Sequence, residues 1–516
     1  MTRSRFSNPI AEGADPWVIF HEGRYYWCLS AAGKGVFVFS SDRLNSLGVR
    51  HLVWSAPASG PFSDQVWAPE LHRIDGVWYI YTTASDGNNA NHRLIVLECR
   101  EAIPTGEFQF KAQLYTGDCM QLGRENRWAI DATPLFWQGK LYLVWSGWRA
   151  DWDEQWLYIA PMSDPWTISG NRVCVCENND YLWERVDEAM TGRGLNEAPQ
   201  VLQRAGRTFV VFSASGSWQP SYKLGLLELV GSDPLSPKSW RKHPEPSFVS
   251  SEQTWGIGHG SFTTSPDGTE DWLVYHAKET RGHDWLRSIF AQQFAFTADG
   301  LPLFGHPVAR GEQIPLPAGT RIKTSGGDYR SDFSSGWSEW DYYGHQDLVA
   351  STPKGLRLGE FGESLAVYRT GEKLILRDRL WLNARMELHF TAGTVSTGVG
   401  VLFRASDIRL GYEGQSGFEV RVRDGEISLH HWTDGSAVLL CSERIHNANP
   451  DCETKLCVQS EGTSLTSHCN GVAVLRFDGL APTAGAVGIR LSEGKTLLRA
   501  FILHSPEDTL KPRQTL

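Results

Sequence analysis

Five ionisable side chains recur roughly every 60 residues over about the first 300 residues, each at the head of a similar stretch. These residues are Asp15, Glu70, Asp131, Glu197 and His259. Carboxylates that share a pocket can cleave a glycosidic bond, because one acid protonates the leaving oxygen while a second carboxylate activates water or attacks the sugar. A third carboxylate near the acid raises the pKa of that acid and keeps it protonated near neutral pH. This chemistry requires a fold that brings distant residues together.

The same local pattern follows each of these five residues. A short strand comes first, then a glycine turn, then a second strand rich in β-branched and aromatic residues. After Glu197, for example, the turn is at Gly206 and the return strand reaches Phe212. Further strands are expected at residues 36–40, 93–98, 156–160, 223–228 and 289–294. Helical periodicity is nearly absent, so the pattern indicates an all-β chain.

Repeated four-stranded units predict a five-bladed β-propeller. The first strand of each propeller blade lines the central axis, so we expect the five leading residues to meet at one mouth of the channel. A β-sandwich with coincidental turns is the alternative, but it does not explain an ionisable residue at the head of every repeat. Burying several carboxylates together is costly. The cluster therefore indicates a functional site rather than a stabilising feature.

The chain is longer than one hydrophobic core normally serves, which favours two domains. We predict the propeller at residues 1–310, a linker rich in Pro, Gly and charge at residues 311–330, and a β-sandwich at residues 331–516. The sandwich is predicted from short alternating runs, at residues 354–358, 365–368, 385–390, 398–403, 417–422, 426–431 and 488–491.

Composition excludes several classes of partner. A net charge of -10 without clustered Lys and Arg argues against nucleic acid, and no apolar run has the length of a membrane span. The N-terminus lacks the apolar region of a signal peptide, so we expect a cytoplasmic protein, or a secreted one whose leader was removed. The nine cysteines lack metal-ligand spacing, and buried free thiols are expected, including Cys174 and Cys176 on one strand face. Oligomeric state is not indicated.

Five motifs, in order and at blade spacing, resemble glycoside hydrolase family 43. The motifs lie at residues 14–18, 67–72, 129–133, 196–199 and 256–261, and the resemblance covers roughly residues 8 to 305. Members of this family are five-bladed propellers that hydrolyse glycosidic bonds with inversion, mostly in plant polysaccharides that contain arabinose or xylose.

The resemblance implies a role for each matching residue. Asp15 matches the general base that activates water, Glu197 matches the general acid, and Asp131 matches the residue that raises the pKa of the acid and orients it. His259 matches the position that in many members coordinates a central ion, often calcium, or a water; no other cofactor is implied. Gly260 departs from the family pattern, which usually has a polar residue there.

Five further residues are predicted to contact substrate. Arg287 matches a basic residue that often contacts sugar in the family. Glu70 and Trp67 lie in the second motif; the alternatives are a salt bridge for Glu70 and a core position for Trp67. Trp17 and Trp218 are aromatic candidates, because sugar faces stack on such rings. For His259 the alternative is a buried histidine without a ligand.

The expected activity is an inverting exo-acting α-L-arabinofuranosidase on arabinan- or arabinoxylan-derived saccharides. The stretches 145–148, 158–166 and 213–218 resemble members that release terminal arabinofuranosyl units. A β-xylosidase acting on xylo-oligosaccharides and a catalytically silent sugar-binding propeller are the alternatives. The last domain resembles concanavalin-like β-sandwiches, including family 66 carbohydrate-binding modules, in Arg404-Ala405 and Gly411-Tyr412-Glu413. It either binds sugar chains or only packs against the rest of the protein.

Overall fold

The computed structural model describes residues 5–505, apart from residues 121–125, 151, 187–191, 279, 322–326, 335, 346–347, 360–370, 378, 412–413 and 446–448. The chain divides into two compact units, Met1–Thr320 and Arg321–Leu516. The predicted linker at residues 311–330 spans this division. The strand expected at residues 365–368 and the Tyr412-Glu413 pair lie outside the described residues.

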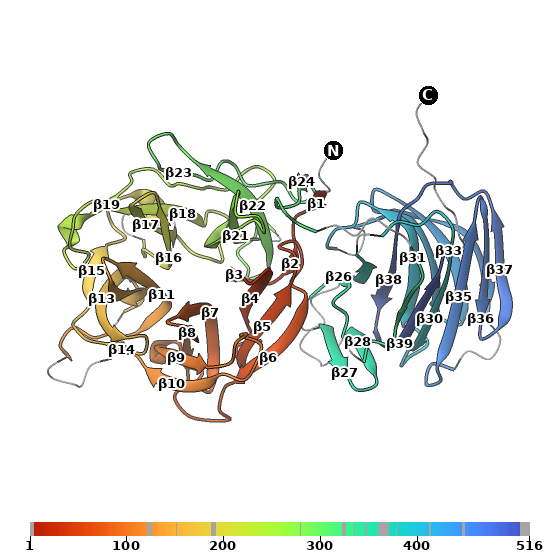
Figure 1. Ribbon diagram of the computed structural model, residues 1–516, viewed down its shortest axis with the longest axis horizontal. Helices are drawn as coiled ribbons and strands as arrows, with labels where there is room; N and C mark the ends of the chain where they lie inside the picture. The colour runs from red at the N-terminus through yellow and green to blue at the C-terminus, as the bar shows by residue number, and fades with distance from the viewer. Residues whose placement is uncertain are drawn as a thin grey trace. The chain divides into compact units, whose positions relative to one another are not determined.

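Unit 1 is built from five antiparallel sheets that follow one another along the chain (Figure 1). The first sheet holds β3 (Trp17–His21), β4 (Arg24–Ser30), β5 (Gly35–Ser41) and β6 (Val49–Ser55). The second holds β7 (Asp64–Ile74), β8 (Val77–Ser85), β9 (Arg93–Cys99) and β10 (Gln109–Gln113). The third holds β11 (Ala129–Trp137), β12 (Lys140–Trp148), β13 (Gln155–Asp164), β14 (Thr167–Ile168) and β15 (Val173–Cys176).

The fourth sheet holds β16 (Asn196–Arg204), β17 (Arg207–Ala214), β18 (Lys223–Leu229) and β19 (Trp240–Lys242). The fifth holds β20 (Gly258–Thr264), β21 (Asp271–Lys278), β22 (Arg287–Phe296), β23 (Pro302–Leu303) and the N-terminal strand β2 (Ala11–Glu12). Each sheet pairs its strands mainly in sequence order, as the repeats predict. The sheets are therefore the five blades of a β-propeller, and this prediction is confirmed.

The ring of blades is closed by the N-terminus. Each first strand contacts the first strand of the next blade, in the cyclic order β3, β7, β11, β16, β20 and back to β3. Strand β2 pairs with β22, with Ala11 opposite Ile289, so residues from both ends of the unit share the fifth blade. Strands β1 (Arg5–Ser7) and β24 (Gln313–Pro315) pair next to it. Closure packs the fifth blade against the first, and each blade keeps only a short outer edge strand.

Apolar residues fill the space between neighbouring blades. Five separate buried clusters each combine residues from two adjacent blades. One example packs Val38 of the first blade with Ile80 and Leu97 of the second. Because both faces of every blade are covered, the strands are apolar on both faces rather than strictly alternating. The blades are thus held together by side-chain packing around a polar centre.

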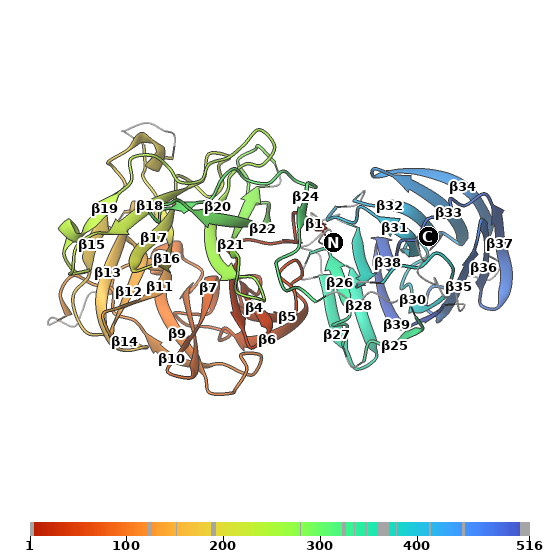
Figure 2. The same ribbon diagram turned by 45° about the horizontal axis from the view of Figure 1, so that its top comes forward.

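Unit 2 consists of two antiparallel sheets (Figures 1 and 2). One sheet holds β25 (Tyr329–Ser331), β27 (Val349–Thr352), β28 (Gly355–Gly359), β30 (Ala384–Thr391), β35 (Thr454–Glu461), β36 (Ser464–Cys469), β37 (Val472–Asp478) and β39 (Lys495–His504). The other holds β26 (Trp340–Tyr343), β29 (Glu372–Leu376), β31 (Gly398–Ser406), β32 (Ser416–Arg423), β33 (Glu426–Thr433), β34 (Ser436–Arg444) and β38 (Ala486–Glu493). One apolar core joins both sheets, including Met386 and Val401, so the predicted β-sandwich is confirmed.

Short 3-10 turns are the helices of the described residues: η1 (Asn89–Asn91), η3 (Leu182–Glu184) and η4 (Pro237–Ser239). In the described part of the chain, no helix has the length and apolar character to cross a membrane. The nine cysteines are all free thiols, as expected. The expectation that they are buried is wrong for Cys452, which is exposed, and only partly met by Cys119, Cys174 and Cys441, which are half-buried.

A buried ion pair in unit 2 gives a test of this fold. Arg490 on β38 donates to both carboxylate oxygens of Glu419 on β32 at 3.1 Å, and both side chains are fully buried. We predict that Glu419→Ala lowers the free energy of unfolding by about 3–5 kcal/mol, because it removes the counter-charge of a buried guanidinium. Hydrogen exchange measured by mass spectrometry should accelerate in β32 and β38 and stay unchanged in unit 1.

The matched control is Glu461→Ala at an exposed position of β35. A surface substitution of this kind changes stability by about 0.5 kcal/mol or less. Equal exchange rates in the two variants would contradict the assignment of a buried ion pair.

Candidate active site

A shared backbone irregularity places the leading residues at the centre of the ring. In four blades the pairing register shifts at the head of the first strand, which marks a β-bulge. Residues in the left-handed region stand at or next to these heads: Asp15 (φ 50), Ala68 (φ 43), Asp131 (φ 55), Ala198 (φ 49) and His259 (φ 47). Non-glycine residues seldom adopt this conformation, and they concentrate at functional sites. The bulge re-aims the side chains that the strand would otherwise point into a blade.

Asp15 lies among three nitrogen-bearing side chains of the fifth blade. Its Oδ1 is 3.2 Å from Arg287 Nη1 and 3.3 Å from His259 Nδ1. Its backbone N–H donates to His276 Nδ1 at 3.2 Å. Burial raises the pKa of Asp15, but Arg287 and His259 outweigh burial and hold that pKa well below its usual range. Asp15 is therefore ionised at every physiological pH.

Glu197 has the opposite tendency, although it belongs to the same cluster. The carboxyl is 8% exposed and accepts a 2.8 Å hydrogen bond from the Tyr222 hydroxyl. Burial raises the pKa of Glu197 to about 7, and the negative charge of Asp15 adds to the increase. The Tyr222 hydrogen bond acts in the other direction, because it stabilises the ionised carboxylate. At neutral pH a large fraction of Glu197 keeps its proton.

Asp131 is the third carboxylate of the cluster. Its Oδ2 accepts a 3.0 Å hydrogen bond from the backbone N–H of Ala198, the residue after Glu197. Burial raises the pKa of Asp131 well above its usual value, and the charges of Glu197 and Asp15 raise it further. Asp131 thus connects the third blade to the bulge that carries Glu197. Because repulsion between carboxylates is mutual, ionisation of either Asp131 or Glu197 disfavours ionisation of the other.

Glu70 joins the cluster, but both of its oxygens already have partners. Gln200 Nε2 donates to Oε1, and His72 Nε2 lies 2.8 Å from Oε2. Burial raises the pKa of Glu70 and lowers the pKa of His72 to about 3. Because His72 is neutral, the contact is a hydrogen bond and not the salt bridge that the sequence left open. This arrangement favours a structural role that links the second and fourth blades.

His259 was expected to hold an ion, often calcium. Ca²⁺ binds six to eight oxygen atoms in proteins, whereas His259 offers nitrogen and its Nδ1 lies against Asp15. Among the described residues, no group of three His, Cys, Asp or Glu side chains could hold a metal ion. The side chains present do not form a calcium cage around His259, and we assign no catalytic step to an ion. The backbone N–H of His259 donates to Ser213 Oγ at 2.8 Å, which fixes the bulge.

Two of the predicted aromatic contacts are packed into the protein. Trp17 is half-buried, donates its indole N–H to the Leu71 carbonyl at 2.7 Å and packs on His72. Trp67 is also half-buried and lies on the His92 ring, with ring centroids 3.9 Å apart. Both rings therefore pack against the second blade, which for Trp67 favours the core alternative.

Trp218 differs from Trp17 and Trp67, because it pairs with an exposed aromatic ring. Its ring centroid lies 5.5 Å from that of Trp285, whose side chain is 60% exposed. Arg287, the partner of Asp15, lies over the Trp285 ring at 5.5 Å, and Arg193 lies over the Trp218 ring at 5.0 Å. The aromatic pair is thus joined to the carboxylate cluster through Arg287. Trp285 was not predicted from the sequence.

The sequence also gave no signal for Tyr222 and His276. Tyr222 bonds Glu197, His276 contacts Asp15, and the two rings stack at 5.6 Å with an interplanar angle of 11°. Burial lowers the pKa of His276 to about 3, so the imidazole is neutral. His276 lies on β21, and Tyr222 directly precedes β18, so both are away from the repeated heads. Only their position beside the heads in three dimensions identifies them.

The cluster therefore pairs a carboxylate that stays ionised with an acid that keeps its proton near neutral pH. A general base and a general acid of hydrolysis have these two states. The third carboxylate, Asp131, contacts the backbone directly after Glu197. The five leading residues of the repeats meet, as the propeller predicts, with Asp15, Asp131 and Glu197 at the centre of the arrangement.

Comparison with known proteins identifies the family of the propeller. The family model for glycosyl hydrolases family 43 matches residues 6–302. Among curated relatives, α-L-arabinofuranosidase 43 of Humicola insolens is 35% identical over 61% of this chain and 66% of its own length. The extracellular exo-α-(1→5)-L-arabinofuranosidase of Streptomyces avermitilis is 35% identical over 59% of this chain and 64% of its own length. The chain therefore covers slightly less than two thirds of the length of each of these relatives.

Solved structures give the same result for the propeller. An α-L-arabinofuranosidase from Lactobacillus brevis is 32% identical, with a TM-score of 0.54 over 59% of this chain and 98% of its own. A xylan β-1,4-xylosidase from Bacillus halodurans covers 97% of this chain with a TM-score of 0.50, but at 15% identity it is similar in fold alone. Because the family model matches more than half of its length, the chain belongs to glycosyl hydrolases family 43.

Proposed function

We propose that the chain is an inverting, exo-acting glycoside hydrolase that releases terminal α-L-arabinofuranosyl units from arabinan- or arabinoxylan-derived saccharides. The observation that carries the proposal is the opposite ionisation of two carboxylates in one cluster, with Asp15 ionised and Glu197 protonated near neutral pH. The choice of sugar is supported by relatives that are named α-L-arabinofuranosidases and are 35% identical to this chain.

The roles follow from the electrostatics of the cluster. Asp15 activates the attacking water, since Arg287 and His259 keep it ionised. Glu197 donates its proton to the leaving oxygen, and Tyr222 orients the carboxyl while bonding Oε1. Asp131 accepts a hydrogen bond from the Ala198 amide and so holds the backbone next to the acid. Inversion follows when water and proton act on opposite faces of the sugar.

Substrate contacts are proposed at two places. Arg287 lies beside Asp15 and can donate to sugar hydroxyls, and the Trp218–Trp285 pair offers aromatic faces for a neighbouring sugar unit. The proposed substrate is thus an arabinose-containing oligo- or polysaccharide. Calcium near His259 remains a prediction, without a ligand cage among the described side chains.

The activity is tested with 4-nitrophenyl α-L-arabinofuranoside and 4-nitrophenyl β-D-xylopyranoside side by side. We predict that the arabinofuranoside is hydrolysed preferentially and that early NMR spectra show the β-anomer of arabinose, because inversion changes the anomeric configuration. Asp15→Asn should lower the rate by about 10²- to 10⁴-fold without unfolding the protein, since it removes the base. Preference for the xyloside would identify a β-xylosidase instead. Sugar binding in calorimetry without any hydrolysis would identify a silent propeller.

The pH dependence follows from the state of Glu197. The reaction requires the protonated acid, and its pKa is about 7. We predict that kcat/KM falls as pH rises through about 7, because this parameter reports ionisations of the free enzyme. The Asp15 ionisation lies far lower and should not limit the rate between pH 5 and 7 at all. A profile that stays flat up to about pH 9 would contradict the assignment of Glu197 as the acid.

Tyr222→Phe tests the neighbour that opposes this pKa increase. The hydroxyl of Tyr222 stabilises the ionised Glu197, so its removal should raise the pKa of Glu197. We therefore predict that the basic limb of the kcat/KM profile moves to higher pH. The matched control is Tyr275→Phe, which removes a buried hydroxyl that bonds Gln292 instead. If the basic limb of the kcat/KM profile lies at the same pH in both variants, Tyr222 does not act on the acid.

A further inference from the structure

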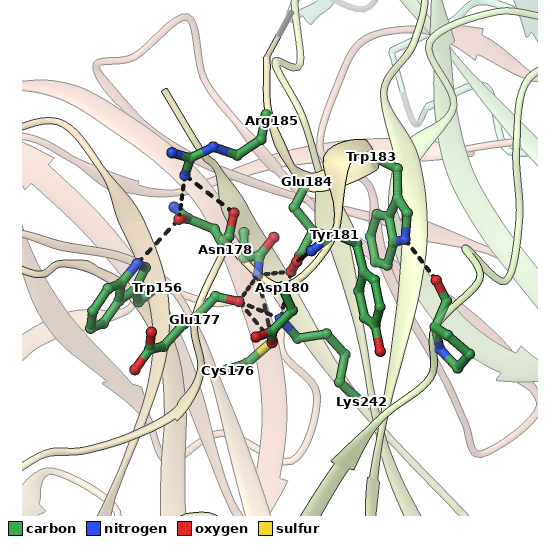
Figure 3. Close-up of polar contacts among 12 residues, drawn as sticks. Trp156, Cys176, Glu177, Asn178, Asp180, Tyr181, Trp183, Glu184, Arg185 and Lys242 are labelled. Atoms are coloured by element: carbon green, nitrogen blue, oxygen red, sulfur yellow. Dashed lines mark hydrogen bonds and ion pairs between the residues drawn. The ribbon is translucent and has the colours of Figure 1, made fainter. Parts of the chain in front are cut away.

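A polar cluster with a buried centre contacts the start of β16, the strand that carries Glu197, and the proposed mechanism does not use it (Figure 3). It is formed by the segment after β15, including η3, together with the end of β19. The labelled members are Trp156, Cys176, Glu177, Asn178, Asp180, Tyr181, Trp183, Glu184, Arg185 and Lys242. Its centre is the side chain of Glu184, which is fully buried.

Glu184 accepts hydrogen bonds through both carboxylate oxygens. Lys242 Nζ lies 2.7 Å from Oε1, and Asn196 Nδ2 donates to the same oxygen at 2.8 Å. The backbone N–H of Tyr181 donates to Oε2 at 3.0 Å. Figure 3 shows Lys242 and Glu184 pointing toward each other beneath η3. Three donors therefore fix this carboxylate in one orientation.

Lys242 is the cation that pairs with the buried Glu184 carboxylate. Its side chain is 7% exposed, and Nζ also contacts Asp180 Oδ2 at 2.6 Å and the Glu177 carbonyl. Burial lowers the pKa of Lys242, but neighbouring acidic groups, Glu184 and Cys176 among them, more than reverse that decrease and raise it. Buried ion pairs often add little net stability. The position of this pair is therefore more informative than its energy.

Glu184 is connected to Glu197 through one residue. Asn196, which Glu184 holds by its side-chain amide, is the first residue of β16 and directly precedes Glu197. The same amide group also donates to the Glu177 carbonyl at 3.0 Å, and the Ser146 hydroxyl donates to the Asn196 carbonyl at 2.8 Å. The backbone N–H of Leu195 donates to the Glu184 carbonyl at 3.2 Å. Glu184 thus contacts the chain at two successive residues before the acid.

These contacts link the outermost and the innermost strands of one blade. Lys242 ends β19, the outer strand of the fourth blade, and Asn196 begins β16, its inner strand. Glu184 lies between them. Asn196 and Glu197 pair with Ala214 and Ser213 of β17, but the register shifts directly after Glu197, where Ala198 adopts the left-handed conformation. The hydrogen bonds of Glu184 restrain the strand next to this interruption, in addition to its pairing with β17.

We propose that Glu184, paired with Lys242, is a positioning residue for Glu197: by holding Asn196 it fixes the direction in which the acid presents its proton. The proposal rests on the assignment of Glu197 as the general acid. Glu184 acts without touching the substrate. Its loss should impair proton donation to the leaving group more than any other step.

The test compares two substrates of similar size, 2,4-dinitrophenyl and phenyl α-L-arabinofuranoside. The dinitrophenolate leaves without a proton, whereas phenolate is a poorer leaving group that needs one. We expect Glu184→Gln to lower kcat on the phenyl substrate by about tenfold or more, because a small displacement of a catalytic group is costly. On the dinitrophenyl substrate the loss should stay within about threefold, and KM should be unchanged for both.

Two variants make the comparison specific. Glu228→Gln removes a buried carboxylate of the same blade that pairs with Arg207 and with Arg241, the neighbour of Lys242. A purely structural loss, as expected for this control, lowers both rates by the same factor. Asn196→Ala removes the held side chain without touching the ion pair and should reproduce the substrate-dependent loss. This second variant decides the question if Glu184→Gln does not fold.

The outcomes separate the inference from the function on which it rests. Wild-type hydrolysis of both substrates, with a phenyl-specific loss in Glu197→Gln, establishes the acid. Given that result, equal losses on both substrates in Glu184→Gln and Asn196→Ala would overturn the positioning role. If the wild type hydrolyses neither substrate, the proposed function itself is overturned. A phenyl-specific loss in both variants, absent from Glu228→Gln, supports the inference.

Discussion

The structure of unit 1 depends on the cost of burying carboxylates together at the centre of a ring. Water solvates an exposed carboxylate, whereas a buried one needs donors, counter-charges or a proton. Asp15 obtains Arg287 and His259 and stays ionised, while Glu197 and Asp131 lie where ionisation is disfavoured. The same physical penalty thus produces two opposite states. The difference between those states is what general acid and base chemistry uses.

Different parts of each blade provide stability and position the buried carboxylates. Apolar clusters between the blades stabilise the ring, so the inner strand heads are free to depart from regular pairing. Bulges at four of these heads turn side chains toward the axis. Strained residues such as Asp131 and His259 persist because packing on both sides determines their backbone. The irregular positions are therefore supported by the regular ones.

The sequence was sufficient for the features that repeat. A head residue, a glycine turn and an aromatic return strand recur five times, so the blades and the meeting of Asp15, Asp131 and Glu197 could be predicted from spacing. Features that depend on a single contact could not be predicted from spacing. Tyr222 directly precedes β18, and His276 belongs to β21, in a stretch whose pattern indicates only burial. Trp17 and Glu70 share a motif-like context with the site, yet their polar atoms are satisfied by neighbours within the protein.

The same distinction applies to the second unit. Alternating runs predict its strands, but they do not indicate which polar residues are structural. Arg404, part of the motif that resembles carbohydrate-binding modules, donates to the carbonyls of Leu382, Ala481 and Gly462. A guanidinium that closes three loops in this way has few donors left for a ligand. A charged residue in a family-like motif therefore supports ligand binding only if its intramolecular partners leave donors free. Arg404 does not meet this criterion. Arg287, which lies beside Asp15 and the exposed Trp285, does meet it.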